Sequence, residues 1–284
     1  MFDLILENKA GNRLTFGPGT PFTVIAIEGL NPPDATINTN KTALLDGEKF
    51  NSSKVNMRIL NLAFVIEENP AENRLKIYKV LKSKQYVKVY FKTDERDVYI
   101  EGYVNSMPIG YFEMKQTVTV SIVCPQPYWR DMETIINDLN TIVPNFHSPF
   151  YSTAEPMIVF SYISNTPSVT VENKGDIDTG MIIELYARNA ISNPKIYNYD
   201  TQEYIGLSFD MQPLDLIRID TREQHKTAVL IRSGVESSVF NSVIQGSTWL
   251  QLPAEGATFV YEVETGLTAD LNVSFNHQNL FEGV

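Results

Sequence analysis

Cys124-Pro125-Gln126-Pro127-Tyr128-Trp129 is the stretch that decides how this chain is organised. The two prolines each fix a backbone φ and remove a main-chain donor, so a sheet ladder cannot continue through them. Tyr128 and Trp129 follow at once, and their large apolar rings with polar tips suit a seam between domains. The stretch therefore predicts a domain seam made by Pro125, Pro127, Tyr128 and Trp129.

The composition is that of a globular protein, and 15 Gly, 15 Pro and 11% aromatic residues with few long helical patterns favour β structure. Of the 284 residues, 43% are hydrophobic and 20% charged, which is enough apolar material for real cores. A formal net charge of −11 argues against broad electrostatic binding to DNA or an anionic membrane, because such binding needs clustered Lys and Arg. Cys124 is the single cysteine, which excludes an internal disulfide and a Cys-rich zinc site, and we expect it to be buried.

Alternating apolar residues predict strands through the first half, over 2–7, 14–16, 22–28, 55–67, 86–92, 97–108 and 112–124. A polar stretch over 31–53 is too long for a tight turn and too polar for a core strand, which predicts a loop that is either disordered or functional. Pro32, Pro33, Asp46 and Gly47 lie in it as candidate subunit-contact residues.

One helix is predicted in the first half. Asn69 is expected to cap it, Pro70 to occupy its first position and Glu72 its third. Leu75, Tyr78 and Leu81, with Ile77 and Val80, are expected to form its apolar stripe.

The second half is predicted to be almost all β. Residues 130–140 are expected to form a short helix or linker, which places a first domain over 1–138 and a second over 139–284. Short strands then recur between turn signals, over 157–162, 168–172, 181–187, 195–199, 214–220, 228–232, 248–252, 258–264 and 270–275. This spacing is typical of a β-sandwich or jelly roll.

Few residues suggest chemistry. His147, His225 and His277 lie far apart and offer no metal-ligand spacing, so we expect no catalytic triad, metal or cofactor. Trp249 could stack against a sugar ring or anchor a sandwich core. The first residues predict no secretory signal, and no apolar run is long enough to cross a membrane.

Several short motifs occur in an order that resembles the distal tail protein (Dit) family of long-tailed phages. They are Glu28-Gly-Leu30, Leu45-Asp-Gly47, Arg58-Ile-Leu-Asn-Leu62, the Asn69-Pro-x-Glu72 helix start, the strand around 96–102, Val123–Trp129, Asn173-Lys-Gly-Asp176 and Trp249-Leu-Gln-Leu252. Ala257 stands where the family usually has Asn, which leaves the turn there in doubt.

The resemblance implies a structural virion protein and not an enzyme. It implies an N-terminal β-sandwich-like domain with one helix that forms a hexameric ring, and a C-terminal domain similar to galectin or carbohydrate-binding modules. The ring would connect the tail tube to the tail-tip or baseplate hub and to host-recognition proteins, with DNA passing through its channel. Such a protein would be made in the host bacterial cytoplasm and end in the virion tail.

Two other functions remain open from the sequence. The chain could be a carbohydrate-binding module that itself recognises host cell-wall sugars, which exposed aromatic rings in the second domain would favour. It could also be a hydrolase with an unrecognised site, although the scarcity of histidine argues against that.

Overall fold

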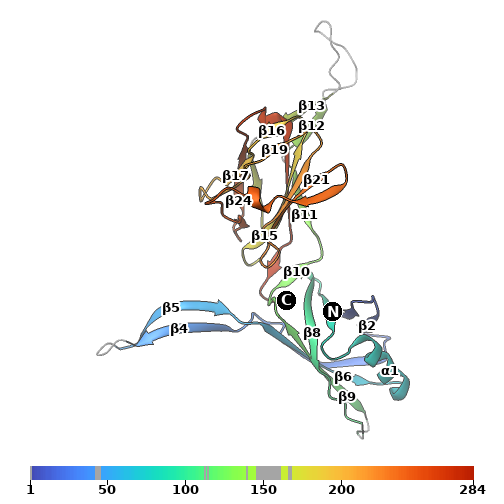
Figure 1. The fold of residues 1–284 in the computed structure, drawn as a ribbon. Coiled ribbons are helices and arrows are strands. Elements are labelled where there is room, and N and C mark those ends of the chain that lie inside the picture. The colour runs from blue at the N-terminus through green and yellow to red at the C-terminus, as the bar shows by residue number, and fades with distance from the viewer. Residues whose placement is uncertain are drawn as a thin grey trace. The chain divides into compact units, whose positions relative to one another are not determined.

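The computed structural model describes residues 2–41, 46–111, 113, 115–138, 140–144, 161–165 and 168–284. The chain forms two compact units (Figure 1), one over Met1–Met132 with Leu280–Val284 and the other over Glu133–Asn279. The predicted boundary was 138/139, and residue 139 lies outside the described residues. No sequence pattern indicated that the segment after the second unit returns to the first.

The first unit is built on a nine-stranded sheet. Seven of its strands run in the order β2-β1-β7-β8-β9-β6-β3, and the other two are β10, which pairs with β8, and β26, which pairs with β10. Its strands are β1 Asp3–Asn8, β2 Arg13–Phe16, β3 Phe22–Glu28, β6 Arg58–Ile66, β7 Tyr86–Lys92, β8 Asp97–Ser106, β9 Gln116–Cys124, β10 Trp129–Asp131 and β26 Leu280–Phe281. Alternate residues of β1, β7 and β9 are buried, as the alternating sequence predicted. β6 and β8 alternate over part of their length, and each also has three consecutive buried residues, Phe64–Ile66 and Val98–Ile100.

Three phenylalanines bring the two edges of this sheet together. Phe16 of β2 lies edge-on to Phe64 of β6, with ring centroids 4.9 Å apart, and Phe22 of β3 contacts both rings. Because β2 and β3 are the outermost strands of the sheet order, these contacts curl the sheet around one core. Cys124 is buried in that core as expected, and burial raises the pKa of its thiol to about 12, so the thiol stays protonated and unreactive.

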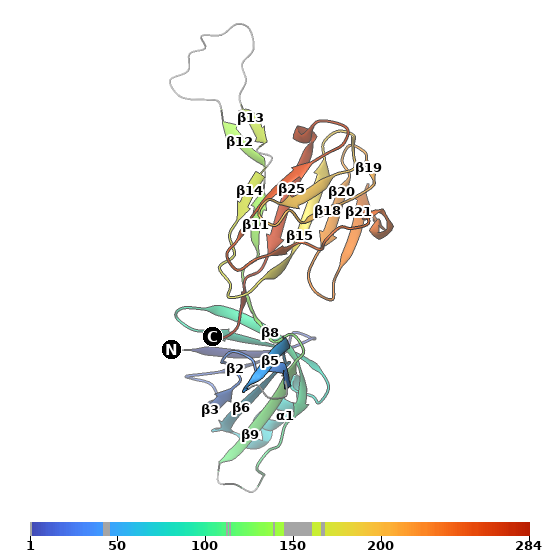
Figure 2. The same ribbon diagram turned by 90° about the vertical axis from the view of Figure 1, so that its left-hand side faces the viewer.

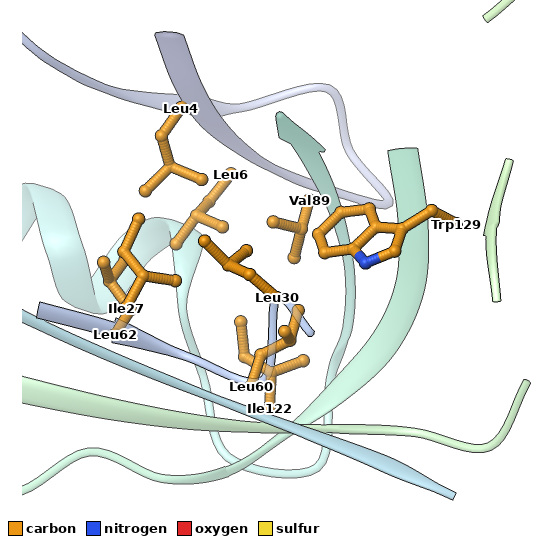
Figure 3. A pocket seen from close by; sticks show the side chains of 9 residues that line it. All are labelled: Leu4, Leu6, Ile27, Leu30, Leu60, Leu62, Val89, Ile122 and Trp129. Carbon is orange, nitrogen blue, oxygen red and sulfur yellow. The ribbon is translucent and has the colours of Figure 1, made fainter. Parts of the chain in front are cut away.

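A small apolar cavity of about 10 Å³ lies inside this core. Figure 3 shows the side chains that line it: Leu4, Leu6, Ile27, Leu30, Leu60, Leu62, Val89, Ile122 and Trp129. The lining offers no hydrogen-bond acceptor and the space is about that of one water, so we expect it to be dry.

The predicted helix is present as α1, Pro70–Val80, but its start differs from the prediction. Asn69 has a left-handed backbone (φ 43°) and its side chain makes no capping hydrogen bond. Instead, the buried Asn73 donates from its side chain to the carbonyl of Glu68. Leu75 was predicted to belong to the apolar stripe but is 59% exposed, because Ile77, Val80 and the following Leu81 are the residues that face the core.

The predicted loop over 31–53 is wrong for most of its length. Within the described residues it contains two antiparallel strands, β4 Ala35–Lys41 and β5 Glu48–Val55, which pair only with each other. The stretch is polar because the hairpin projects into solvent and not because it is irregular. Figure 1 shows this hairpin extending away from the rest of the first unit, and we call it the arm.

The second unit is the predicted β-sandwich. Its strands are β11 Ile135–Asp138, β12 Asn140–Pro144, β13 Ser161–Asn165, β14 Ser168–Val171, β15 Thr179–Ala187, β16 Ile191–Ser192, β17 Lys195–Asn198, β18 Tyr204–Gly206, β19 Asp210–Met211, β20 Leu216–Asp220, β21 Thr227–Arg232, β22 Val235–Ser238, β23 Gln251–Leu252, β24 Ala257–Glu262 and β25 Leu271–His277. Two single-turn helices, η1 Phe240–Ser242 and η2 Thr268–Asp270, lie between strands.

The larger sheet runs β11-β25-β15-β20-β21-β22, and Figure 2 shows its central strands side by side. The smaller sheet runs β14-β24-β17-β18. Phe259 of β24 stacks on Phe275 of β25 at 4.8 Å, which joins the two sheets at the centre of the core.

Residues 130–140 were predicted to form a short helix or a linker. The prediction of a helix is wrong for the described residues of that range. β10 pairs with β8 and β26, whereas β11 pairs with β25 of the second unit. Ile135 and Ile136 are β-branched and flank a sheet edge, so pairing outweighs the weak helical pattern. His147 and the first four residues of the strand predicted over 157–162 lie outside the described residues.

His277 gives the second unit a pH dependence. It is 2% exposed between its cross-strand neighbours Ile135 and Met181, and burial lowers the pKa of its imidazole. The unfolded chain therefore binds the proton more readily than the folded unit. We expect the stability of this unit to be constant above about pH 7.5 and to fall as the pH drops through about 6.5, by up to ~1.4 kcal/mol per pH unit.

Hydrogen exchange of β15 and β25 peptides between pH 5.5 and 8, after correction for intrinsic exchange rates, measures this effect. His277→Gln should flatten the profile. His225→Gln is the matched control, because His225 lies exposed in a turn. An unchanged profile in His277→Gln would show that another group is responsible.

Candidate assembly surface

The arm has one apolar face and one polar face. Its register pairs Ala35 with Val55, Ile37 with Ser53 and Thr39 with Phe50, and partners across a ladder share a face. The ion pair of Lys41 with Glu48 lies on the same face at its far end, beyond the apolar row. The opposite face is lined by Thr36, Asn38, Asn40, Lys49, Ser52 and Lys54.

The apolar face of the arm is uncovered. Ile37 is 63% exposed and Phe50 is 61% exposed, and Val55 is also exposed. An isolated two-stranded hairpin is marginally stable in water, because it has no core of its own. An apolar row on such a hairpin is therefore typical of a surface that another chain covers.

A second uncovered surface lies on the outer side of β6 and β9. The side chains of these strands that face the core alternate with an outer row of paired side chains, namely Ile59 with Val123, Asn61 with Ser121, Ala63 with Thr119 and Val65 with Thr117. Ile59 is exposed, whereas Val65 at the other end of the row is buried. None of these eight side chains is ionisable, although 20% of the chain is charged. We call this row the outer β6/β9 face. The nearest charge is the exposed carboxylate of Glu28, which accepts a hydrogen bond from Asn61 at 3.1 Å at one edge of the row.

The point where β3 leaves the sheet requires glycine. Gly29 has a φ of +89°, and a Cβ there would lie 2.2 Å from the carbonyl oxygen of Ile59. Both the backbone conformation and the close approach exclude any other residue without a local shift. Gly29 thereby fixes where the chain turns from the sheet toward the arm.

Arg58 lies beneath this turn and is 3% exposed. Its guanidinium donates hydrogen bonds to the carbonyl oxygens of Gly29 and Asn31, and the bond to Asn31 is 2.6 Å long. The same guanidinium lies 5.7 Å from the centre of the Trp129 ring. Burial lowers the pKa of this guanidinium, while the fields of Cys124 and Glu282 oppose that shift. The first turn of the arm is thus held by a buried cation.

The predicted subunit-contact residues lie at the two ends of the arm. Pro32 and Pro33 belong to its root, where Pro32 is exposed and Pro33 is half-buried. Asp46 and Gly47 are exposed at the start of the returning strand, next to Lys41 and Glu48, whose side chains form an ion pair at 3.6 Å. Leu45 of the predicted motif lies outside the described residues.

The four predicted seam residues have different environments. Pro127 and Trp129 are buried, Tyr128 is half-buried and Pro125 is exposed. Trp129 packs in the core of the first unit, 6.2 Å from Phe91 between ring centroids, which is a core role that the sequence did not reveal.

Trp249 packs against the core of the second unit. Phe240 stacks on it with ring centroids 5.7 Å apart and an angle of 23°, so one face of the indole is covered. The exposed ring of this pair is that of Phe240, at 49%. Sugar stacking by Trp249 remains a prediction.

The residues of the assembly surface were mostly missed from the sequence. Ile37 and Phe50 are separated by polar residues, and a bulge between Asn38 and Thr39 breaks the alternation that would have revealed a shared face. Arg58 was noted only as part of a motif, because burial of an arginine has no sequence signal.

The described residues contain no group of three or more His, Cys, Asp or Glu side chains placed to hold a metal. Among the same residues, no helix is long and apolar enough to cross a membrane.

Comparisons with known proteins agree with this architecture. Residues 10–124 match the family described as phage tail protein RIFT-related domain. The chain is similar to the crystal structure of the Dit protein of phage SPP1, described as a paradigm of the hub adsorption apparatus in Gram-positive infecting phages. That match has a TM-score of 0.69 at 14% identity and covers 98% of this chain and 99% of the other.

Two structures of the phage P2 baseplate in its activated conformation also match. The one with Ca has a TM-score of 0.51 at 10% identity and the one with Sr a TM-score of 0.52 at 11%, and each match covers 100% of both chains. No curated protein matches the sequence. The resemblance predicted from the sequence is confirmed: the chain contains a phage tail protein RIFT-related domain over residues 10–124 and has the fold of the distal tail protein family along almost its whole length.

Proposed function

We propose that this protein is a structural component at the distal end of a phage or phage-like tail. It forms a hexameric ring that joins the tail tube to the hub or lysin protein and to receptor-binding proteins, and DNA passes through the ring. The observation that carries the proposal is the arm with its uncovered apolar face, on a chain whose fold is that of a distal tail protein.

A closed ring of identical subunits needs two different surfaces on each subunit, one for each neighbour. The apolar face of the arm supplies one. The outer β6/β9 face supplies the other, because none of the eight side chains of its row is ionisable. In this arrangement Ile37 and Phe50 of one subunit pack on the outer β6/β9 face of the next.

The charge of the chain is compatible with passage of DNA. A channel wall rich in Lys and Arg would bind phosphates in a salt-dependent way and retain the DNA. A net charge of −11 favours a wall that does not bind it.

Electron microscopy and native mass spectrometry of the purified protein test the proposal. We expect six-fold rings and a mass of about six chains of 32.1 kDa. A particle that stays monomeric over the concentration range of both methods, or a closed assembly of another symmetry, would contradict the hexameric ring.

A further inference from the structure

Arg58 joins three parts of the chain that are far apart in sequence. Besides Gly29 and Asn31 at the arm root, its guanidinium donates to the carbonyl oxygens of Pro127, at 2.6 Å, and Glu282, at 2.5 Å. A guanidinium has five N–H donors in a rigid plane, so one side chain can hold four carbonyls in a fixed arrangement. Arg58 therefore fixes the arm root against the residues that precede and follow the second unit.

The segment Leu280–Val284, which we call the latch segment, holds the arm root in a second way. The main-chain N–H of Val284 donates to the carbonyl of Leu30 at 3.3 Å. A Cβ on Gly283 would lie 3.3 Å from that same oxygen and 3.3 Å from Cδ of Pro32, so Gly283 lies directly against the root. Leu30 itself lines the apolar cavity beside Trp129 (Figure 3), which links the root to the core.

The latch segment is in turn fixed to the first unit. Leu280 and Phe281 pair with β10, and the ring of Phe281 is buried with the Arg96 guanidinium 4.3 Å from its centre. Arg96 also donates to the carbonyl of Gly283. The latch segment is therefore an ordered part of the first unit and not a loose tail.

The order of these parts in the sequence has a consequence for assembly. The latch segment follows β25, so it is synthesised after the whole second unit. Until then the arm root lacks the contacts from Glu282, Gly283 and Val284, and the core lacks Phe281.

We infer that the latch segment and Arg58 set the position of the arm, so that a subunit presents its assembly surface only after its second unit has been made. Arg58 is a positioning residue in this device: it acts through the arm root and does not contact the neighbouring subunit. The assembly half of the inference rests on the proposed function, because it takes the arm as the assembly surface.

Gly283→Val tests the latch with little risk to folding, because the three atoms nearest to an added Cβ all belong to Leu30 and Pro32 of the root, at 3.3 to 3.5 Å. In the full-length protein, diluted until it is monomeric, we follow the two main-chain N–H groups that donate to the root, Val284 to Leu30 and Asn56 to Asp34. We expect their hydrogen exchange, corrected for intrinsic rates, to quicken ~10-fold as the root opens locally, with β7 and β8 unchanged. Leu280→Val is the matched control in the same segment. Ring yield of Gly283→Val, measured by native mass spectrometry, should fall in parallel.

Arg58→Met is the second variant, since Met fills similar apolar space but donates no hydrogen bond. We expect the same loosening of the root, whereas Arg13→Met, which removes an exposed arginine paired with Glu7, should not produce it. Unchanged exchange of the root in both latch variants would overturn the inference. Faster exchange with an unchanged ring yield would overturn the part of the inference that concerns assembly. If the natural sequence forms no rings but the variants still show faster exchange, the proposed function is wrong while the latch inference holds.

Discussion

Replacing both Ile37 and Phe50 with glutamate should abolish ring formation and leave a folded monomer. Burial of each of these side chains in a subunit contact is worth ~1.5–3 kcal/mol, and a factor of ten in affinity corresponds to about 1.4 kcal/mol. The double change removes that gain and adds two charges that would have to be desolvated against the outer β6/β9 face. Because every contact in a closed ring is the same, the loss is repeated at each of them.

The polar face of the arm provides the matched control. Asn38→Glu with Asn40→Glu adds the same two charges to the same hairpin, but on the face opposite to Ile37 and Phe50. This variant should still form rings in analytical ultracentrifugation, while the apolar-face variant sediments as a monomer. If both variants assemble equally well, the apolar face is not a subunit contact. If neither does, the two faces are not distinct in function.

The partner face can be examined from the other side. Ala63→Glu places one charge in the middle of the outer β6/β9 face without touching the arm. Mixing this variant with the Ile37/Phe50 double variant should give dimers at most, because each variant keeps one intact surface and only one productive contact remains between them.

The sheets were largely predictable because they follow local rules. In β1, β7 and β9 the alternation of buried and outward side chains is strict, and the ends lie at turn residues or prolines. Period-two alternation specifies a strand wherever one face is buried. The arm lacks that condition, since neither of its faces is covered within the subunit. Its sequence therefore looked like a loop, and its strands are visible only in the structure.

The contacts that hold the arm root were unpredictable for a different reason. Arg58 contacts Glu282 across a sequence separation of 224 residues. All four of its acceptors are main-chain carbonyls, which every residue type has, so the sequence does not indicate which residues it contacts. The same applies to Trp129, whose position after two prolines suggested a boundary. The chain does change direction there, but it first inserts the indole into the core that it is leaving.

Trp129→Ala should destabilise the first unit by ~3–5 kcal/mol, the usual cost of truncating a large buried aromatic side chain. Trp129 has no exposed surface and lies beside an existing cavity, so the new void would merge with that cavity. Its indole N–H has no hydrogen-bond partner, so the loss is one of packing and of its contact with Arg58. Hydrogen exchange should show faster opening of β1, β7 and β8 while β15, β20 and β25 keep their protection. Trp129→Phe, which keeps most of the volume, should cost less than half as much. A loss under about 1 kcal/mol in Trp129→Ala would mean that the core collapses around the site and that Trp129 is not its anchor.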